Sequence, residues 1–331
     1  MVYKRGVQQQ YRQARPSYPH KFYPMLALEG KREDIKEPSR KAQRKLDGTR
    51  IMVIKDGENV KIMAARSWAN DYASRYLNIV DDVRKLPVDR CVLDGELTFF
   101  EKGTDRDVFV NALSKPETKK DFDIKAMMFD VLWVDDDNLE HLPFKDRDEI
   151  LKTLIPSGLR HVKAIKTVTK NKMEYFNQLK AKQGEGVVLK EEASPYRQGQ
   201  RTSDWLKVKH WKDTDAVVVG YTRGQGSRAK TFGSIVLAQR DKQGNWHYIG
   251  KSSGFKEADI RRMLAKMKQL ETSKSPLVDA PKDLNIKAWV KPQIVAQVKY
   301  YERTPYNILR FPDFIRERSD KKPSECLLPK P

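Results

Sequence analysis

The stretch Gln43-Arg44-Lys45-Leu46-Asp47-Gly48-Thr49-Arg50 places a lysine, an acid, a glycine and an arginine within six positions. A free lysine has a pKa of about 10.4, so its amine is almost fully protonated at neutral pH and cannot attack. Neighbouring cations, a metal ion and partial desolvation can together favour the neutral amine. We therefore expect Lys45 to be a nucleophile and other segments to supply those neighbours. A surface strand that runs into a turn is the competing interpretation of so short a motif.

The local geometry of the stretch follows from side-chain alternation. In an extended strand Lys45 and Asp47 share one face, while Arg44 and Leu46 take the other. Gly48 then provides a bend. Residues 51–54 and 60–64 flank Asp56-Gly57, which predicts a hairpin with a favoured turn sequence directly after the lysine.

Composition points to a folded protein with a polyanionic partner. The 331 residues allow about two domains, and 39% apolar residues are enough for ordinary cores. The net charge of +20 and the pI of about 9.7 favour nucleic acid over a membrane as partner. A basic protein without a specific anionic partner is the alternative.

Cysteine and histidine usage excludes several classes of site. Cys91 and Cys326 make neither a disulfide framework nor a four-cysteine zinc site, and the five histidines lack metal-ligand spacing. The sequence shows no continuous apolar run of membrane-spanning length and no signal peptide. We expect an intracellular protein without membrane association.

The chain divides into three predicted parts. Residues 1–20 are rich in Gln, Arg, Lys and Tyr and predict a basic N-terminal arm that contacts phosphates or is a plain disordered tail. Residues 21–212 form the first domain, with a helix at about 76–86, strands at 91–100, 126–134 and 184–190, and helices at 146–154 and 172–182. Residues 213–331 carry short strands at 216–221, 234–239, 246–249, 288–290 and 294–300 and a helix at 256–269, which suggests a small barrel.

A second basic feature lies at the end of the first domain. In Trp205-Leu206-Lys207-Val208-Lys209-His210 the alternation places Lys207 and Lys209 on one strand face. The two lysines would face an anion together if the apolar side is buried, whereas a solvated edge strand is the alternative.

Two further matches are not taken as sites. The segment from Gly224 to Thr231 nearly matches a phosphate loop, but Ala229 replaces its second glycine and a strand follows, so we expect a hairpin loop. The acids at 135–137 precede Leu142-Pro143 and predict a solvated turn.

Read in chain order, five segments resemble the nucleotidyltransferase motifs of ATP-dependent DNA ligases. They are residues 45–50 (KLDGTR), 94–96 (DGE), 129–130 (FD), 185–190 (EGVVLK) and 205–209 (WLKVK). Residues 310–321, which begin Arg310-Phe311-Pro312, resemble the family's final motif in the form typical of DNA-joining members. The resemblance covers nearly all of residues 22–321.

The resemblance implies an α+β fold: a nucleotidyltransferase (adenylation) domain of antiparallel sheets with flanking helices, followed by a C-terminal OB-fold β-barrel. It also implies ATP as AMP donor, Mg²⁺ or Mn²⁺ as metal, and nicked duplex DNA as substrate, acted on by a monomer. Lys45 would attack the α-phosphate of ATP, AMP would pass to the 5′-phosphate of the nick, and the 3′-hydroxyl would then displace AMP.

The family's residue roles are carried over by position. Catalytic positions are Lys45, Asp47, Lys207 and Lys209, and the metal would bind Glu185 and Glu96, the second of which also matches a ribose contact. Phe129 matches an aromatic that stacks on adenine. Arg66 also matches a DNA-phosphate contact, and Arg318 and Lys321 would close over the triphosphate. The other expected nucleotide-site residues, with these three included, are Gln43, Arg50, Arg66, Lys190, Arg201, Arg318 and Lys321.

Departures from the family pattern leave alternatives open. Gln43 stands where many members have an acid, which affects selection of ATP over GTP. Large members carry an N-terminal DNA-binding domain that we do not expect here, so DNA contact would fall to basic faces, the N-terminal arm or a loop such as residues 223–232. The rival interpretations are an RNA ligase, a capping-type nucleotidyltransferase and a non-catalytic nucleic-acid-binding module.

Overall fold

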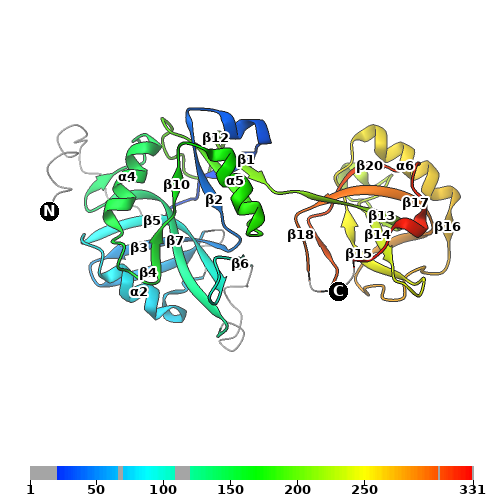
Figure 1. Ribbon diagram of the computed structural model, residues 1–331, viewed down its shortest axis with the longest axis horizontal. Helices are drawn as coiled ribbons and strands as arrows, with labels where there is room; N and C mark the ends of the chain where they lie inside the picture. Colours follow the sequence, from blue (N-terminus) through cyan, green and yellow to red (C-terminus); the bar gives the residue numbers. More distant parts are fainter. Residues whose placement is uncertain (1–20, 66–69, 109–119, 305, 330–331) are drawn as a thin grey trace. The chain divides into compact units, whose positions relative to one another are not determined.

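A computed structural model describes residues 21–65, 70–108, 120–304 and 306–329 (Figure 1). The chain divides into two compact units, Met1–His210 and Trp211–Pro331. The expected basic arm, residues 1–20, and Arg66 lie outside the described residues.

The first unit contains two sheets. The larger has strand order β4-β3-β5-β7-β8, with β6 added on β5 and β9 on β7. Its strands are β3 (Thr49–Asp56), β4 (Asn59–Ala64), β5 (Arg90–Glu101), β6 (Asp107–Val108), β7 (Phe122–Val134), β8 (Asp137–Asn138) and β9 (Val162–Ala164). The smaller sheet has the order β1-β12-β11-β2-β10, with β1 (Leu26–Glu29), β2 (Arg40–Lys45), β10 (Thr167–Val168), β11 (Gly186–Glu191) and β12 (Arg201–Lys209). All pairings are antiparallel except β1 with β12 and β7 with β9.

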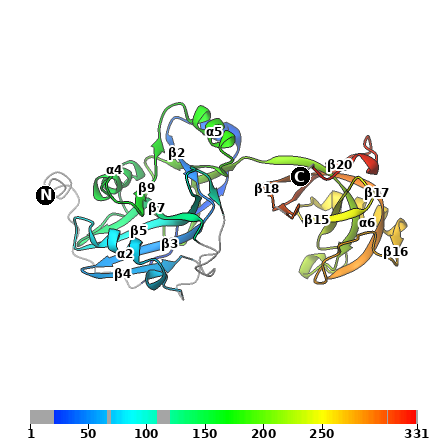
Figure 2. The same ribbon diagram turned by 60° about the horizontal axis from the view of Figure 1, so that its bottom comes forward.

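Helices cover the outer faces of the two sheets (Figures 1 and 2). The α-helices α2 (Leu77–Arg84) and α4 (Phe144–Leu154) pack on one face of the larger sheet. The helix α5 (Lys172–Ala181) and the short 3-10 helix η1 (Arg32–Lys36) cover the smaller sheet. A further 3-10 turn, η2 (Ala73–Arg75), precedes α2.

Alternation along β3 shows how the sequence builds these layers. Ile51 and Val53 face the helices α2 and α4, whereas Met52 lies in the cluster that joins the larger sheet to Trp205 of the smaller sheet. Since each apolar side chain is buried on one side or the other, both faces of β3 are fixed and its register is fixed with them. That register sets where Lys45 and Arg50 lie. The predicted hairpin is confirmed, because β3 pairs with β4 from Asp56 and Asn59 onward and Gly57 has φ 58°.

The second unit is an antiparallel sheet with one long helix. Its strand order is β15-β14-β13-β17-β16, with β20 beside β17, and α6 (Glu257–Gln269) packs against it. The strands are β13 (Lys212–Thr222), β14 (Ile235–Arg240), β15 (Trp246–Ser252), β16 (Glu271–Thr272), β17 (Ile286–Tyr300) and β20 (Asp313–Glu317). The separate ribbon β18 (Glu302–Arg303) with β19 (Leu309–Arg310) and the 3-10 turns η3 (Gly226–Arg228) and η4 (Pro323–Glu325) complete the unit.

One strand prediction is wrong. Residues 288–290 and 294–300 were expected as two strands, but they belong to the single strand β17. Its pairing with β13 steps from Ile294 opposite Val218 to Trp289 opposite Gly220. Pro292 lies in that irregular stretch, where its missing N–H removes no regular ladder bond, so the proline does not end the strand.

No helix among the described residues is long and apolar enough to cross a membrane.

Burial of His210 generates a prediction about acid stability. Its ring lies against Phe176 of α5, with ring centroids 3.8 Å apart, and its buried Nε2 has no hydrogen-bond partner among the described residues. Burial, helped by the charge of Lys180, lowers the pKa of His210 from 6.5 to about 4. Between pH 6.5 and 4, His210 is therefore protonated in the unfolded chain but neutral in the native chain. Protonation stabilises the unfolded chain, so the free energy of unfolding falls as the pH drops from about 6.5 towards 4.

We predict that His210→Phe makes the free energy of unfolding less sensitive to pH between 7 and 5, by on the order of 1 kcal/mol. Urea unfolding at several pH values measures this difference, with His141→Phe at an exposed position as control. Parallel pH profiles for His210→Phe and the unsubstituted protein would contradict the assignment.

Candidate active site

The centre of the smaller sheet brings Lys45 and Lys209 to the same place. Gly186 of β11 pairs with Lys45 of β2 on one side and with Lys209 of β12 on the other. The residue before it, Glu185, accepts a hydrogen bond from Lys45 Nζ, and its Oε1 lies 3.1 Å from Lys209 Nζ. The Glu185 side chain is 5% exposed, so one buried carboxylate holds two ammonium groups at the surface of the sheet.

Lys207 lies on the same face of β12 as Lys209. Its Nζ is 3.0 Å from Glu29 Oε1, and the Glu29 side chain is 61% exposed. A contact with so exposed a carboxylate contributes little energy and is easily exchanged for another anion. Lys209 thus lies across β11 from Lys45, and Lys207 lies two residues away from Lys209 on the same strand face.

Arg50 is fixed by a buried carboxylate. Its Nε and Nη2 donate to Asp94 Oδ1 and Oδ2 at 3.0 and 2.6 Å, and Tyr196 Oη donates to Asp94 Oδ2 at 2.6 Å. Burial acts to lower the pKa of Arg50, but Asp94 outweighs it and raises that pKa above its ordinary value. The guanidinium carbon lies 5.3 Å from the centroid of the Phe129 ring. The hydrogen bonds to Asp94 therefore hold the positively charged Arg50 guanidinium in a fixed position next to the Phe129 ring.

Glu96 pairs in register with Arg50 across β3 and β5. Burial raises the pKa of the Glu96 carboxyl from 4.5 to about 8, although Lys45 and Arg50 act in the opposite direction. The carboxylates of Asp94 and Glu185 add to the increase. Burial thus favours the neutral form of Glu96, and a cation placed near its carboxyl group would favour the ionised form.

Glu96 and Glu185 can bind a magnesium ion only if substrate phosphates and water complete its coordination shell. Among the described residues, no cluster of three or more His, Cys, Asp or Glu side chains could hold a metal. Glu96 and Glu185 are two carboxylates in one site, and Mg²⁺ commonly binds through one or two carboxylates together with substrate phosphates and water. The donor set therefore fits Mg²⁺ or Mn²⁺ bound together with a nucleotide.

A buried network of charged side chains, Lys190, Asp130 and Arg147, lies next to Phe129. Lys190 Nζ donates to the Phe129 carbonyl at 2.7 Å and lies 3.5 Å from Asp130 Oδ2. Arg147, fully buried, donates to both Asp130 oxygens at 2.7 and 3.1 Å. Burial, opposed by Asp130, lowers the pKa of Lys190 to about 8. Lys190 is 1% exposed, so the structure directs the ammonium of this expected nucleotide-site residue to protein groups beneath Phe129.

A hydrogen-bond chain fixes the orientation of the Gln43 amide. Thr167 Oγ1 lies 2.6 Å from Asp148 Oδ1, which can only accept, so the hydroxyl donates to Asp148. Gln43 Nε2 then donates to Thr167 Oγ1 at 3.0 Å and faces the Phe129 carbonyl at 3.5 Å. The amide oxygen of Gln43 is left as the group available to accept a hydrogen bond from a ligand.

The remaining expected residues lie in other surroundings. The Asp47 backbone N–H donates to Asp107 Oδ2 at 2.7 Å. Arg201 lies at the first residue of β12, where its Nη1 donates to the Ala27 carbonyl at 2.6 Å. In the second unit, Arg318 binds Asp320 at 2.8 Å and Asp215 at 3.2 Å, and Lys321 binds Glu325 at 3.1 Å.

Sequence reasoning missed several residues that shape the site. Asp94 and Trp205 belong to segments that the motifs already include, but only their neighbours were assigned roles. Tyr196, Thr167 and Asp148 carry no sequence signal, because only the strand pairing brings them to Asp94 and Gln43.

The fold and site define a nucleotidyltransferase domain with a second, OB-fold domain. The model of the ATP dependent DNA ligase domain matches residues 24–209, and that of the ATP dependent DNA ligase C terminal region matches residues 228–321. The chain belongs to the ATP-dependent DNA ligase family, whose members use ATP and act on nicked DNA. The expected α+β fold class is confirmed.

Individual relatives agree with this family. The multifunctional non-homologous end joining protein LigD of Mycolicibacterium smegmatis is 28% identical over 313 residues, which is 93% of this chain and 40% of that protein. A DNA ligase of Thermococcus fumicolans is 30% identical over 302 residues, 85% of this chain and 52% of that protein. A solved mycobacterial DNA ligase D in complex with ATP and MES gives a TM-score of 0.53 at 26% identity, covering 92% of this chain and 98% of that one. The chain thus spans about half or less of the length of the LigD protein and of the Thermococcus DNA ligase.

Gly48 shows why the motif at Lys45 needs a glycine. A Cβ built there would lie 2.4 Å from the Leu97 carbonyl oxygen and 2.9 Å from Glu96 Cγ. Any side chain would therefore push β5 and Glu96 away from Lys45.

We predict that Gly48→Ala lowers the free energy of unfolding by about 1–3 kcal/mol and weakens ATP binding, because the added methyl group displaces Glu96. Urea unfolding and calorimetric titration with ATP measure the two effects. Gly158→Ala is the matched control, since a Cβ there meets nothing within 4 Å. Equal behaviour of the two variants would show that the close approach has no consequence.

Proposed function

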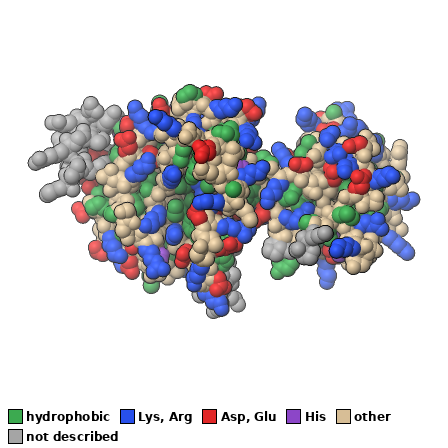
Figure 3. All heavy atoms as spheres, in the orientation of Figure 1, with side chains coloured by type: hydrophobic (Ala, Val, Ile, Leu, Met, Phe, Trp, Pro, Cys, Tyr) green, Lys and Arg blue, Asp and Glu red, His purple; other side chains and the backbone are tan. Residues whose placement is uncertain are grey.

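We propose that this protein is an ATP-dependent DNA ligase that seals 5′-phosphate/3′-hydroxyl nicks in duplex DNA through a lysyl-AMP intermediate on Lys45. The observation that carries the proposal is the placement of Lys45, Lys209 and Glu185 at one point of the sheet. In this proposal residues 21–212 are the adenylation domain, residues 213–331 are the OB-fold domain, and the protein acts as a monomer inside the cell. Lys and Arg side chains on the visible face of each unit are consistent with a polyanionic substrate (Figure 3).

The first step uses Lys45 as the nucleophile. Its Nζ attacks the α-phosphorus of ATP, the bond to the bridging oxygen breaks, and pyrophosphate leaves with the electron pair. The Glu185 carboxylate, which accepts a hydrogen bond from Nζ, is placed to receive the amine proton. Lys207 and Lys209 stabilise the negative charge that develops on the α-phosphate oxygens.

The later steps displace at phosphorus again. The 5′-phosphate of the nick attacks the lysyl-AMP and releases Lys45, and the 3′-hydroxyl then attacks the 5′-phosphorus and releases AMP. When Mg²⁺ or Mn²⁺ is bound, held by Glu96 and Glu185, it neutralises phosphate charge. We assign Arg318 and Lys321 to the leaving pyrophosphate of the first step, and Asp47, Arg66 and Arg201 to further contacts with nucleotide or DNA.

Nucleotide choice follows from the Gln43 amide. With its nitrogen bound to Thr167, the Gln43 oxygen accepts from the exocyclic amine of adenine, whereas guanine offers a carbonyl oxygen at that position. We propose that Phe129 stacks on the base and that Lys190 acts by supporting Phe129.

We predict that Lys45→Ala lowers nick sealing at least about a thousand-fold, because the nucleophile is absent, while nicked-duplex binding changes little. A gel assay with an end-labelled nicked duplex measures sealing, and fluorescence anisotropy measures binding. Lys45→Arg is the matched control, since it keeps the positive charge but should not seal. Sealing by either variant near the unsubstituted rate would remove Lys45 from the mechanism.

We further predict that Thr167→Val reduces the preference for ATP over GTP by about ten-fold, because the Gln43 amide loses the acceptor that orients it. Rates of self-adenylation and self-guanylation give the ratio, and Thr167→Ser, which keeps the hydroxyl, should retain it. An unchanged ratio in Thr167→Val would contradict the role of the hydrogen-bond chain.

A further inference from the structure

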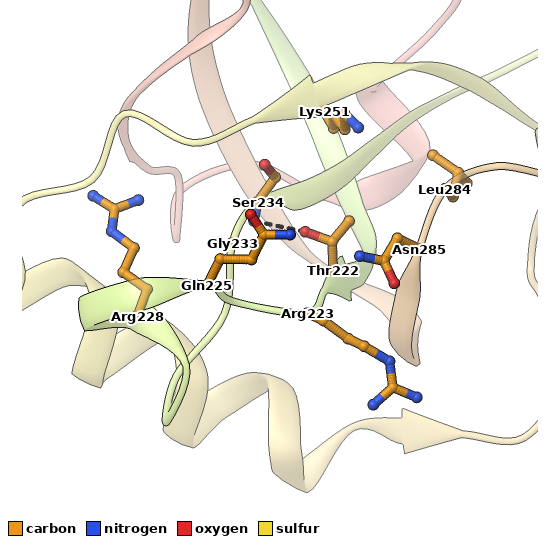
Figure 4. A pocket seen from close by; sticks show the side chains of 9 residues that line it. All are labelled: Thr222, Arg223, Gln225, Arg228, Gly233, Ser234, Lys251, Leu284 and Asn285. Carbon is orange, nitrogen blue, oxygen red and sulfur yellow. Dashed lines mark hydrogen bonds between the residues drawn. The ribbon is translucent and has the colours of Figure 1, made fainter.

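A pocket of about 290 Å³ in the second unit lies between the β13–β14 connection, β15 and the segment before β17 (Figure 4). The connection joins two antiparallel strands, which confirms the hairpin loop expected for residues 224–231. The guanidinium ends of Arg223 and Arg228 point apart and away from the pocket (Figure 4). These basic side chains therefore do not converge on one anion, in contrast to Lys45 and Lys209, which meet at Glu185.

The proposed nucleophile, Lys45, lies where the chain passes from one sheet of the first unit to the other. The strand β2, which ends at Lys45, belongs to the smaller sheet, and β3, which begins at Thr49, belongs to the larger sheet. Residues 46–48 lie in neither strand, so the hydrogen-bond ladders of the two sheets do not include them. Other contacts therefore decide how Lys45 is held relative to the larger sheet.

Asp107 of β6 contacts residues on both sides of Lys45. Its Oδ2 accepts a hydrogen bond from the Asp47 backbone N–H at 2.7 Å, and its Oδ1 accepts one from Arg44 Nη2. The Asp107 side chain is 2% exposed and the Arg44 side chain is 7% exposed. One buried carboxylate therefore holds the residue before Lys45 and the second residue after it.

Arg44 is itself fixed by further contacts on its own side of the strand. Alternation places the side chains of Arg44 and Lys45 on opposite faces of β2. Arg44 Nη1 donates to Asp105 Oδ1 at 3.1 Å, and its Nη2 also donates to the Asp105 carbonyl at 2.7 Å. The guanidinium carbon lies 5.9 Å from the centroid of the Phe100 ring. These contacts hold β2 from the face opposite to the Lys45 side chain.

The short strand β6 connects Asp107 to the part of the larger sheet that faces the nucleotide site. Asp107 pairs with Phe100 of β5, the strand that also carries Glu96. The other neighbour of β5 along this edge is β7, which carries Phe129. Asp107 therefore connects the chain around Lys45 to the same sheet that positions Glu96 and Phe129.

We propose that Asp107 is a positioning residue for the attack of Lys45 on ATP. This inference rests on the proposed function, because it assigns a role in the first step of that reaction. Displacement at phosphorus needs the nucleophile in line with the leaving group, and a misplacement of about 1 Å can lower the rate about a hundred-fold. By binding Arg44 and the Asp47 N–H, Asp107 fixes the main chain of Lys45. Buried ion pairs favour one defined geometry more than they add stability, which suits this role.

Two variants of the full chain remove these contacts. Asp107→Asn keeps the shape of the side chain but has one acceptor oxygen, so its amide nitrogen faces one of the two donors. Arg44→Met combined with Asp107→Leu replaces the buried pair by apolar side chains of similar size, a change that often preserves stability. The second variant keeps the test decisive if Asp107→Asn fails to fold. The matched control is Asp105→Asn, which changes the other carboxylate at Arg44, a side chain that is 60% exposed.

We predict that both variants self-adenylate about a hundred-fold more slowly at saturating ATP, while the ATP concentration for half-maximal rate changes less than about three-fold. Sealing of a nicked duplex that already carries AMP on its 5′-phosphate does not use Lys45 as nucleophile or leaving group, so its rate should stay within about three-fold. Asp105→Asn should resemble the unsubstituted protein in both assays. Single-turnover kinetics with labelled ATP and with a labelled pre-adenylated nick measure the rates, and thermal unfolding identifies the folded variants.

The two assays separate positioning from a general structural role. Unchanged self-adenylation in a folded variant, or an equal loss of rate in both assays, overturns the assignment of Asp107. An equal loss in Asp105→Asn also overturns it, because the contact with the Asp47 N–H would then have no consequence. If the unsubstituted protein, after treatment with pyrophosphate, neither self-adenylates nor seals the pre-adenylated nick, the ligase proposal itself is refuted, whatever the variants do.

Discussion

The Glu185 carboxylate between Lys45 and Lys209 is the interaction on which the site depends. It exists because β11 lies between β2 and β12, so that Gly186 pairs with both lysines at once. Gly186 has φ 144°, and a Cβ there would lie 2.1 Å from the Val208 carbonyl oxygen. Glycine at this position therefore allows β11 and β12 to approach closely enough for one carboxylate to serve two ammonium groups.

The rest of the first unit holds that arrangement rigid. Buried ion pairs of this kind contribute more to a single defined geometry than to stability, because desolvation offsets most of their attraction. Asp94 fixes Arg50, and Asp130 with Arg147 fixes Lys190 beneath Phe129. A nucleotide that enters between Phe129 and Lys45 would thus meet groups that are already oriented, which reduces the reorganisation needed during reaction.

The sequence predicts the main features of the fold and which charged residues share a strand face. It does not predict the hydrogen bonds that fix Gln43 and Phe129. The strand and helix positions around Lys45 follow from periodicity, and the shared face of Lys207 and Lys209 follows from alternation. Residues 288–290 and 294–300 were predicted as two strands, but β17 continues through Pro292, where its pairing with β13 is irregular. Lys190 was expected at the nucleotide, and only the strand packing shows that its ammonium lies under Phe129. Thr167 and Asp148 are distant from Gln43 in sequence, so no local pattern could join them.

The most direct test of the central claim is label transfer from ATP to Lys45. The purified protein is treated with pyrophosphate to remove any bound AMP, then incubated with Mg²⁺ and ATP labelled at either the α- or the γ-phosphate, denatured and mapped by peptide. The account predicts acid-labile label from the α position alone, on the peptide that contains Lys45. Label from the γ position, label on another residue, or no label after the pyrophosphate treatment would contradict it.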